Sequence, residues 1–183
     1  MSTPEQPLVV IGVGNVLLGD DAIGVRVVEG LRRLAEHDPL ALPRETRLVD
    51  GGTLLRDLPH TVKGARGLVL VDALRAGDQE GTISVRHGDA IVSAGGARER
   101  SEPDSIGELL AVARLMGWLP EPVALVGIEV AHIDYGVELS PVVAAALPAA
   151  IVAVADELRV MDEQIASQRH TAGQARRTTG ATA

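Results

Sequence analysis

The apolar residues of this chain fall into short continuous runs that alternate with segments of helical periodicity. The runs at Leu8–Val13, 67–73 and Val123–Glu129 have the length and the Val, Leu and Ile content of strands buried on both faces. A shorter run at 46–50 is typical of a further strand, and 81–86 alternates apolar with polar residues, as a half-exposed edge strand does. The pattern therefore predicts five strands.

Between these runs the apolar residues recur at the spacing of amphipathic helices. Helices are predicted at about 21–36, 54–60, 104–118 and 140–161. The last of these is largely apolar, and a kink is expected at Pro148. Strands that alternate with helices indicate a parallel sheet covered by helices on both faces. The strand at 81–86 should run antiparallel, because the connection before it is too short for a crossover helix.

The length of 183 residues suits one domain with a sizeable core, which we expect over residues 1–163. From residue 164 onward Ser, Thr, Gly, Ala and Arg dominate without periodicity, so 164–183 is predicted to be a disordered tail. The longest nearly apolar run, 142–155, is too short to cross a bilayer.

Composition removes several classes of function. The chain has one Trp, one Tyr and no Phe, so it lacks stacking platforms for nucleic-acid bases, and its net charge of −8 opposes a nucleic-acid partner. With no cysteine there can be no disulfide, thiolate nucleophile or thiolate-bound metal. The first residues carry no basic segment of a signal peptide, so we expect a cytoplasmic protein.

The first strand leads into a glycine-rich turn whose charge is wrong for phosphate. Gly14 and Gly19 have the spacing of a P-loop, but Asp20 and Asp21 stand where Lys and Ser/Thr are required. The dinucleotide fingerprint also fails, because its third glycine is absent. Two carboxylates would repel a phosphate, so the turn favours a cation or a polarised neutral group. The alternative for Asp20 is a helix N-cap.

Two other predicted strands also end in an acid. Asp50 follows the second strand and Asp72 the third, and parallel strands place their carboxyl ends at one edge of the sheet. If the first and third strands are neighbours, Asp21 and Asp72 face one crevice, in a constellation suited to cation binding or acid–base chemistry. Asp50 has an alternative as an ordinary turn residue before two glycines.

At these residues the chain resembles the hydrogenase maturation endopeptidases, which trim the C-terminal extension from the large subunit of a nickel–iron hydrogenase. The matching segments are 12–24, 50–53, 71–73, 125–129 and 136–141. The resemblance implies a three-layer α/β/α fold with a five-stranded, mostly parallel sheet. It also implies that the protein binds no cofactor tightly and recognises its substrate by a nickel ion that the substrate carries.

The resemblance also implies the site residues. Asp21 and Asp72 correspond to two acidic metal-contacting positions and are the candidate catalytic residues. The segment Asp50, Gly51, Gly52 and Thr53 corresponds to a loop that borders the substrate cleft.

The family's third metal contact is a histidine, but here Pro103 is followed by Asp104, which is either a third ligand or a helix N-cap. Three carboxylates would prefer nickel over magnesium less strongly than a set containing imidazole. Of the five histidines, His132 follows the last strand and is the one best placed to substitute.

The sequence thus predicts an endopeptidase that removes the C-terminal extension of a nickel-loaded hydrogenase large-subunit precursor, with no nucleic-acid or membrane partner. The motifs of serine esterases (G-x-S-x-G) and zinc proteases (H-E-x-x-H) are absent. Two alternatives stay open. One is a non-catalytic assembly factor that recognises the metal-loaded subunit, and the other is a magnesium-dependent hydrolase of small molecules.

Overall fold

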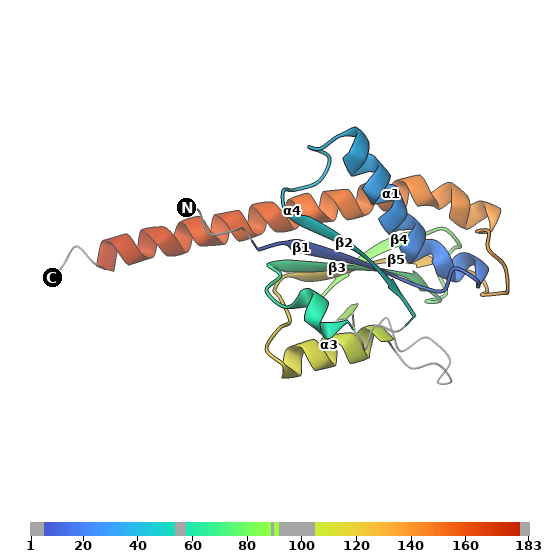
Figure 1. The fold of residues 1–183 in the computed structure, drawn as a ribbon, viewed down its shortest axis with the longest axis horizontal. Helices are drawn as coiled ribbons and strands as arrows, with labels where there is room; N and C mark the ends of the chain where they lie inside the picture. The colour runs from blue at the N-terminus through green and yellow to red at the C-terminus, as the bar shows by residue number, and fades with distance from the viewer. Residues whose placement is uncertain (1–5, 54–57, 89, 92–104, 180–183) are drawn as a thin grey trace.

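A computed structural model describes residues 6–53, 58–88, 90–91 and 105–179. The strands are β1 (Leu8–Val13), β2 (Thr46–Gly52), β3 (Gly67–Leu74), β4 (Ile83–His87) and β5 (Val123–Glu129). The helices are α1 (Ile23–His37), α3 (Ser105–Leu115) and α4 (Pro141–Thr179), with short 3-10 turns η1 (Gly19–Ala22) and η3 (Pro59–Val62). Figure 1 shows α1 and α4 on one side of the sheet and α3 on the other.

The five strands form one sheet in the order β2-β1-β3-β5-β4. The pairs β1–β2, β1–β3 and β3–β5 are parallel, and β4 pairs antiparallel with β5 at the edge. The predicted mostly parallel sheet with one antiparallel edge strand is therefore confirmed. Since β1 lies between β2 and β3, the strand order reverses there, which is where open α/β sheets bind ligands.

Two apolar cores fill the spaces between the three layers. Alternate residues of one strand enter different cores: Leu8 and Val10 of β1 pack with α1 and α4, whereas Val9 and Ile11 pack with α3. The central strands β1 and β3 are buried along their whole length, which explains their continuous apolar sequences. The predicted three-layer α/β/α fold is confirmed.

Several helix boundaries differ from the prediction, and α3 ends at Leu115 where the sequence predicted 118. The first helix is divided into η1 and α1, and of the predicted helix 54–60 the structure describes Leu58, which caps the 3-10 turn η3, and the first two residues of that turn. Asp104, the predicted start of the third helix, lies outside the described residues.

The boundary of the predicted tail at residue 164 is corrected, because α4 continues through Pro148 and on to Thr179. Ile165 is buried in the core on the α1 side, so the helix still has a packed face beyond the expected boundary. After that point the hydroxyls of Ser167 and Thr171 donate to the carbonyls four residues earlier. Composition alone missed this, because a helix that is already nucleated by packing extends at little further cost.

Residues Pro141–Thr171 are also long and apolar enough to cross a membrane, by length and composition only. The prediction that the apolar run at 142–155 is too short to cross a bilayer is therefore corrected for this longer helix. The finding is weak evidence for a membrane span, because core helices of soluble proteins pass the same test. One face of α4 packs into the core through residues such as Val143, Val154 and Leu158.

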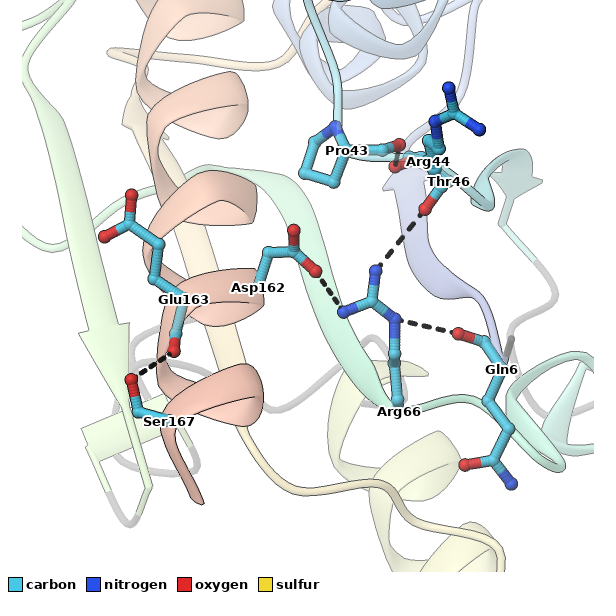
Figure 2. A network of polar contacts seen from close by, with 8 residues as sticks. All are labelled: Gln6, Pro43, Arg44, Thr46, Arg66, Asp162, Glu163 and Ser167. Carbon is cyan, nitrogen blue, oxygen red and sulfur yellow. Dashed lines mark hydrogen bonds and ion pairs between the residues drawn. The ribbon is translucent and has the colours of Figure 1, made fainter. Parts of the chain in front are cut away.

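A buried arginine fastens α4 to the edge of the sheet where β1 and β3 begin. The guanidinium of Arg66 pairs with Asp162 of α4 and donates to the carbonyls of Gln6, at 2.8 Å, and Arg44, at 3.4 Å (Figure 2). The nearby hydroxyl of Thr46 donates to the carbonyl of Pro43 at 2.7 Å. These contacts lie at the amino ends of the parallel strands, opposite the edge that carries the candidate site.

Candidate active site

The carboxyl ends of β1 and β3 are closely covered by the start of α1. A Cβ on Gly24 would lie 2.3 Å from the carbonyl oxygens of both Val13 and Val71, and one on Gly14 would lie 1.7 Å from that of Asp21. Only glycine permits such an approach of backbone to backbone. The glycines of the turn therefore bring the Asp20–Asp21 pair onto the junction between β1 and β3.

Asp21 is buried in η1, with 5% of its surface exposed. Its Oδ2 accepts the backbone N–H of Asn15 at 2.7 Å, which ties the carboxylate to the loop that follows β1. A buried carboxylate is costly unless hydrogen-bonded, so this contact holds the charge at the edge of the sheet.

Asp72 is buried near the carboxyl end of β3, with 3% of its surface exposed. Its Oδ1 accepts the N–H of Ala73 at 2.9 Å. In the alternation of β3 it shares a side with Leu70 and Leu74, which pack in the core on the α3 side. Asp72 lies on β3, and Asp21 lies in the turn that follows the neighbouring strand β1. The two predicted catalytic acids thus lie at the same edge of the sheet, as the sequence predicted.

The segment Asp50–Thr53 lies across β1 from Asp72. Asp50 pairs with Gly12 of β1, and Gly12 pairs on its other side with Val71 of β3. Asp50 is exposed, and its Oδ1 accepts the N–H of Gly52 at 3.0 Å, the contact of a turn-forming aspartate. Gly51 and Gly52 are half-buried and Thr53 is exposed, so the segment forms an accessible border to the same edge.

The third predicted metal contact, Asp104, lies outside the described residues. Within 6–53, 58–88, 90–91 and 105–179, no three acidic or histidine side chains are grouped so as to hold a metal ion. The substitute considered above, His132, is exposed and its Nε2 lies 3.4 Å from a carboxylate oxygen of Asp134. It therefore faces solvent from the loop after β5.

Two further buried acids lie at this edge: Asp20, which the sequence analysis treated as one of a cation-favouring pair or as a helix N-cap, and Glu129, which it did not single out. The Oδ1 of Asp20 accepts the N–H of Ser140 at 2.6 Å, so Asp20 joins η1 to the start of α4. The carboxylate of Glu129 accepts the N–H groups of Ala76 and Gly77 at 3.0 and 2.8 Å. Glu129 ends the buried strand β5, and Asp72 lies two residues before the end of β3, so an acid after an apolar run was the signal available in both. Both acids position loops around the edge.

The arrangement has a definite chemical character. Asp21 and Asp72 bring two buried carboxylates to the point where the strand order reverses, and a concentration of negative charge in a buried setting favours a cation. Oxygen ligands of this kind bind divalent metals and can polarise a carbonyl group through them.

Comparison with known proteins identifies the family of the chain. A family model described as hydrogenase maturation protease matches residues 25–157. The hydrogenase expression/formation protein HupD of Rhodobacter capsulatus is 37% identical over 158 residues, which cover 85% of this chain and 72% of that protein. The hydrogenase 2 maturation protease of Escherichia coli is 29% identical over 155 residues, covering 83% of this chain and 90% of that protein.

Solved structures give the same result. The hydrogenase maturating endopeptidase HybD from Escherichia coli superposes with a TM-score of 0.72 at 28% identity, covering 84% of this chain and 93% of that one. A solution structure of an Escherichia coli endopeptidase matches with a TM-score of 0.70, also at 28% identity, and covers 81% and 90% of the two chains.

The predicted family and the predicted endopeptidase activity are confirmed, in preference to the assembly factor and the magnesium-dependent hydrolase. The chain belongs to the hydrogenase maturation protease family and is a hydrolase, an endopeptidase that acts on a hydrogenase large-subunit precursor.

Proposed function

We propose that this endopeptidase recognises its precursor by a nickel ion already inserted into it, and that Asp21 and Asp72 bind that nickel while the C-terminal extension is removed. The observation that carries the proposal is the burial of both carboxylates at the one edge where β1 and β3 are neighbours. Nickel would thus be part of the substrate, and the protein would hold no tightly bound cofactor of its own.

The nickel would act chiefly by positioning. With Asp21 and Asp72 on the ion, the peptide bond next to it is held in one orientation, and a carbonyl oriented toward the metal is polarised for attack by water. Asp104 would supply a third oxygen ligand. The gain from such positioning reaches several kcal/mol of barrier in well-oriented reactions, on the order of 7–11.

The segment Asp50, Gly51, Gly52 and Thr53 is proposed to border the cleft that receives the polypeptide. Its support is the register of β2 with β1, which sets Asp50 across Gly12 from the strand that carries Asp72. Gly52 has a φ of +53° and nothing within 4 Å of a Cβ position, so the backbone there is open to a passing chain.

We further propose that the protein works in the cytoplasm, without nucleic-acid or membrane partners. The support is its acidic composition, with a net charge of −8, and the packing of one face of α4 into the core. Fractionation of cells that express the full chain should recover it with the soluble cytoplasmic proteins. Recovery in washed membranes would contradict this location.

The test of function uses purified protein with the large-subunit precursor in nickel-loaded and nickel-free forms. Mass spectrometry should show loss of the C-terminal extension only from the loaded form. Asp21→Asn and Asp72→Asn should each lower kcat/KM at least about a hundredfold, because each removes a charge that would bind the metal. The asparagine variants keep the size of the side chain.

Asp78→Asn is the matched control, because Asp78 is exposed in the loop after β3. It should process the precursor at the rate of the unmodified protein. Circular dichroism should show that all three variants are folded. Equal cleavage of nickel-free precursor would contradict recognition through nickel, and full activity of Asp72→Asn would remove Asp72 from the mechanism.

A further inference from the structure

Beside the candidate site lie four exposed apolar side chains that the proposed mechanism does not use. Val16, Leu17, Tyr135 and Val137 are 39%, 60%, 94% and 61% exposed. We propose that these four residues, here named the rim patch, dock an apolar stretch of the precursor that is flanked by basic residues and lies next to the scissile bond. This inference rests on the proposed function and deepens it.

The rim patch is assembled from two loops that are far apart in the sequence. Leu18 forms a parallel bridge with Gly136, the N–H of Gly19 donates to the carbonyl of Gly136 at 2.8 Å, and the N–H of Gly136 donates to the carbonyl of Leu17 at 3.0 Å. Because Tyr135 and Val137 flank Gly136, this pairing brings the apolar residues of both loops together.

The two loops are held in place by polar contacts. Asp20 accepts the N–H of Ser140 at 2.6 Å, and the side chain of Asn15 accepts the N–H of Leu17 at 3.0 Å. The guanidinium of Arg26 donates to the carbonyl of Val137 at 3.4 Å. A surface fixed before binding loses less conformational entropy when a partner docks. The rim patch is thus suited to recognition.

The rim patch is also continuous with the site. The Asn15 residue that orients Leu17 donates its own N–H to the buried carboxylate of Asp21 at 2.7 Å. Leu17 and Asp21 thus both contact Asn15, so a polypeptide that delivers its metal to Asp21 would come close to Leu17. This continuity is why the occupant is assigned as the substrate.

Tyr135 is the strongest single indication. The chain contains one Tyr and one Trp and no Phe, and its only Tyr is 94% exposed and outside both cores. Exposed aromatic residues in a fixed setting are enriched among the residues that dominate binding energy at interfaces. A contiguous group of apolar side chains at the surface marks an interaction site more often than isolated ones do.

Apart from Arg26, which is paired with Glu29, and His132, which lies 3.4 Å from Asp134, the charges named beside the rim patch are acidic, and they indicate the kind of partner. Asp134 and Glu138 are exposed next to Tyr135 and Val137, and Asp50 is exposed at the end of β2. A partner with basic residues on either side of an apolar stretch would complement them. A second copy of this chain would instead set Asp134 and Glu138 against the same acids of its partner in a symmetric contact, and like charges oppose such an association.

The test compares two double variants in processing of the nickel-loaded large-subunit precursor. Leu17→Ser with Tyr135→Ser should raise KM about tenfold and change kcat less than threefold, because it removes binding contacts and leaves the acids in place. The control is Leu40→Ser with Leu115→Ser. These leucines are 82% and 85% exposed and lie after α1 and at the end of α3, away from the site, so KM should not change.

Charge is tested separately with Asp134→Asn and Glu138→Gln. Each should raise KM two- to threefold at low salt, and the difference should shrink at high salt as screening increases. A photoreactive phenylalanine derivative at Tyr135 should crosslink to the precursor polypeptide, whereas the same group at Leu40 should not. The crosslink keeps the proposal testable even if the serine variant does not fold.

The outcomes separate this inference from the function on which it rests. If the unmodified protein does not cleave the loaded precursor, the proposed function fails. If it cleaves, but the folded rim-patch variant retains its KM and Tyr135 gives no crosslink, the rim patch alone is wrong. A dimer in sedimentation that the rim-patch substitutions convert to monomer would overturn the proposal and assign this surface to a second copy.

Discussion

Individual glycines determine how close the first turn comes to the sheet. Gly14 has a positive φ of +136°, whereas the φ of Gly24 is not positive. A Cβ on either residue would nevertheless lie within 2.3 Å of a backbone carbonyl oxygen. The requirement at Gly24 is therefore close approach alone, and at Gly14 it is both close approach and conformation. The position of Asp21 depends on the same contact, because the atom facing Gly14 is its carbonyl oxygen.

We expect Gly14→Ala to lower the free energy of unfolding by more than about 3 kcal/mol, since backbone must move to admit the methyl group. Gly64→Ala is the control. Gly64 has a φ of +74° but nothing within 4 Å of a Cβ, so its substitution should cost only about 1–2 kcal/mol of backbone strain. Urea titration of both variants measures the difference, and equal losses would show that the close approach is unimportant.

At the scale of elements, α4 is attached to the sheet by apolar packing and by one polar anchor. Arg66 is buried, with 7% of its surface exposed, and its charge is balanced by Asp162 in the middle of α4. The carbonyls of Gln6 and Arg44 complete the surroundings of the guanidinium (Figure 2). The pair therefore connects α4 to the chain entering β1, to the loop before β2 and to the start of β3.

We expect Asp162→Asn to lower the free energy of unfolding by about 2 kcal/mol, because it leaves a buried guanidinium without its counter-charge. The side chain of Asp162 is itself 41% exposed, so the loss should be smaller than for a fully buried pair.

Asp156→Asn, also in α4, serves as the control for Asp162→Asn. It breaks an exposed ion pair between Asp156 and Arg159, whose side chains are 62% and 50% exposed respectively. The free energy of unfolding should therefore fall by less than about 0.5 kcal/mol. Chemical denaturation of the Asp162→Asn and Asp156→Asn variants measures the two losses of stability. Equal stability of the two variants would mean that the Arg66 anchor contributes nothing.

The whole molecule is organised around a sheet whose central strands belong to both cores. Leu8 and Val10 contact the α1 and α4 side while Val9 and Ile11 contact the α3 side, so neither layer can be lost without exposing the other face of β1. Ile165 of α4 belongs to the same core as Leu8 and Val10 of β1. The middle of α4 should therefore unfold together with the sheet.

Thermal unfolding of the full chain is therefore expected to be a single transition, with calorimetric and van't Hoff enthalpies in a ratio close to about 1. Far-UV circular dichroism and the fluorescence of Trp118, which packs under the ammonium of Lys63 at 5.0 Å, should report the same midpoint. A separate early transition in helix content would instead show that α4 melts independently of the sheet.

The sequence by itself determined the strands, the mixed sheet and the family. Short Val- and Ile-rich apolar runs bounded by turn residues are typical of a sheet covered on both faces, and the turn after β1 carries acids where a phosphate loop needs a cation. The candidates Asp21 and Asp72 followed from the edge that parallel strands share, together with the resemblance to the family. Their role as ligands for nickel remains a prediction.

Only the tertiary structure decided the contacts between residues distant in the chain. The pairing of Leu18 with Gly136, the bond from Ser140 to Asp20 and the Arg66–Asp162 pair leave no local periodicity in the sequence. The extension of α4 past residue 164 was likewise missed, because it depends on the core receiving Ile165. Local patterns encode which element a segment forms, whereas the partner of each side chain depends on how the elements are placed around the sheet.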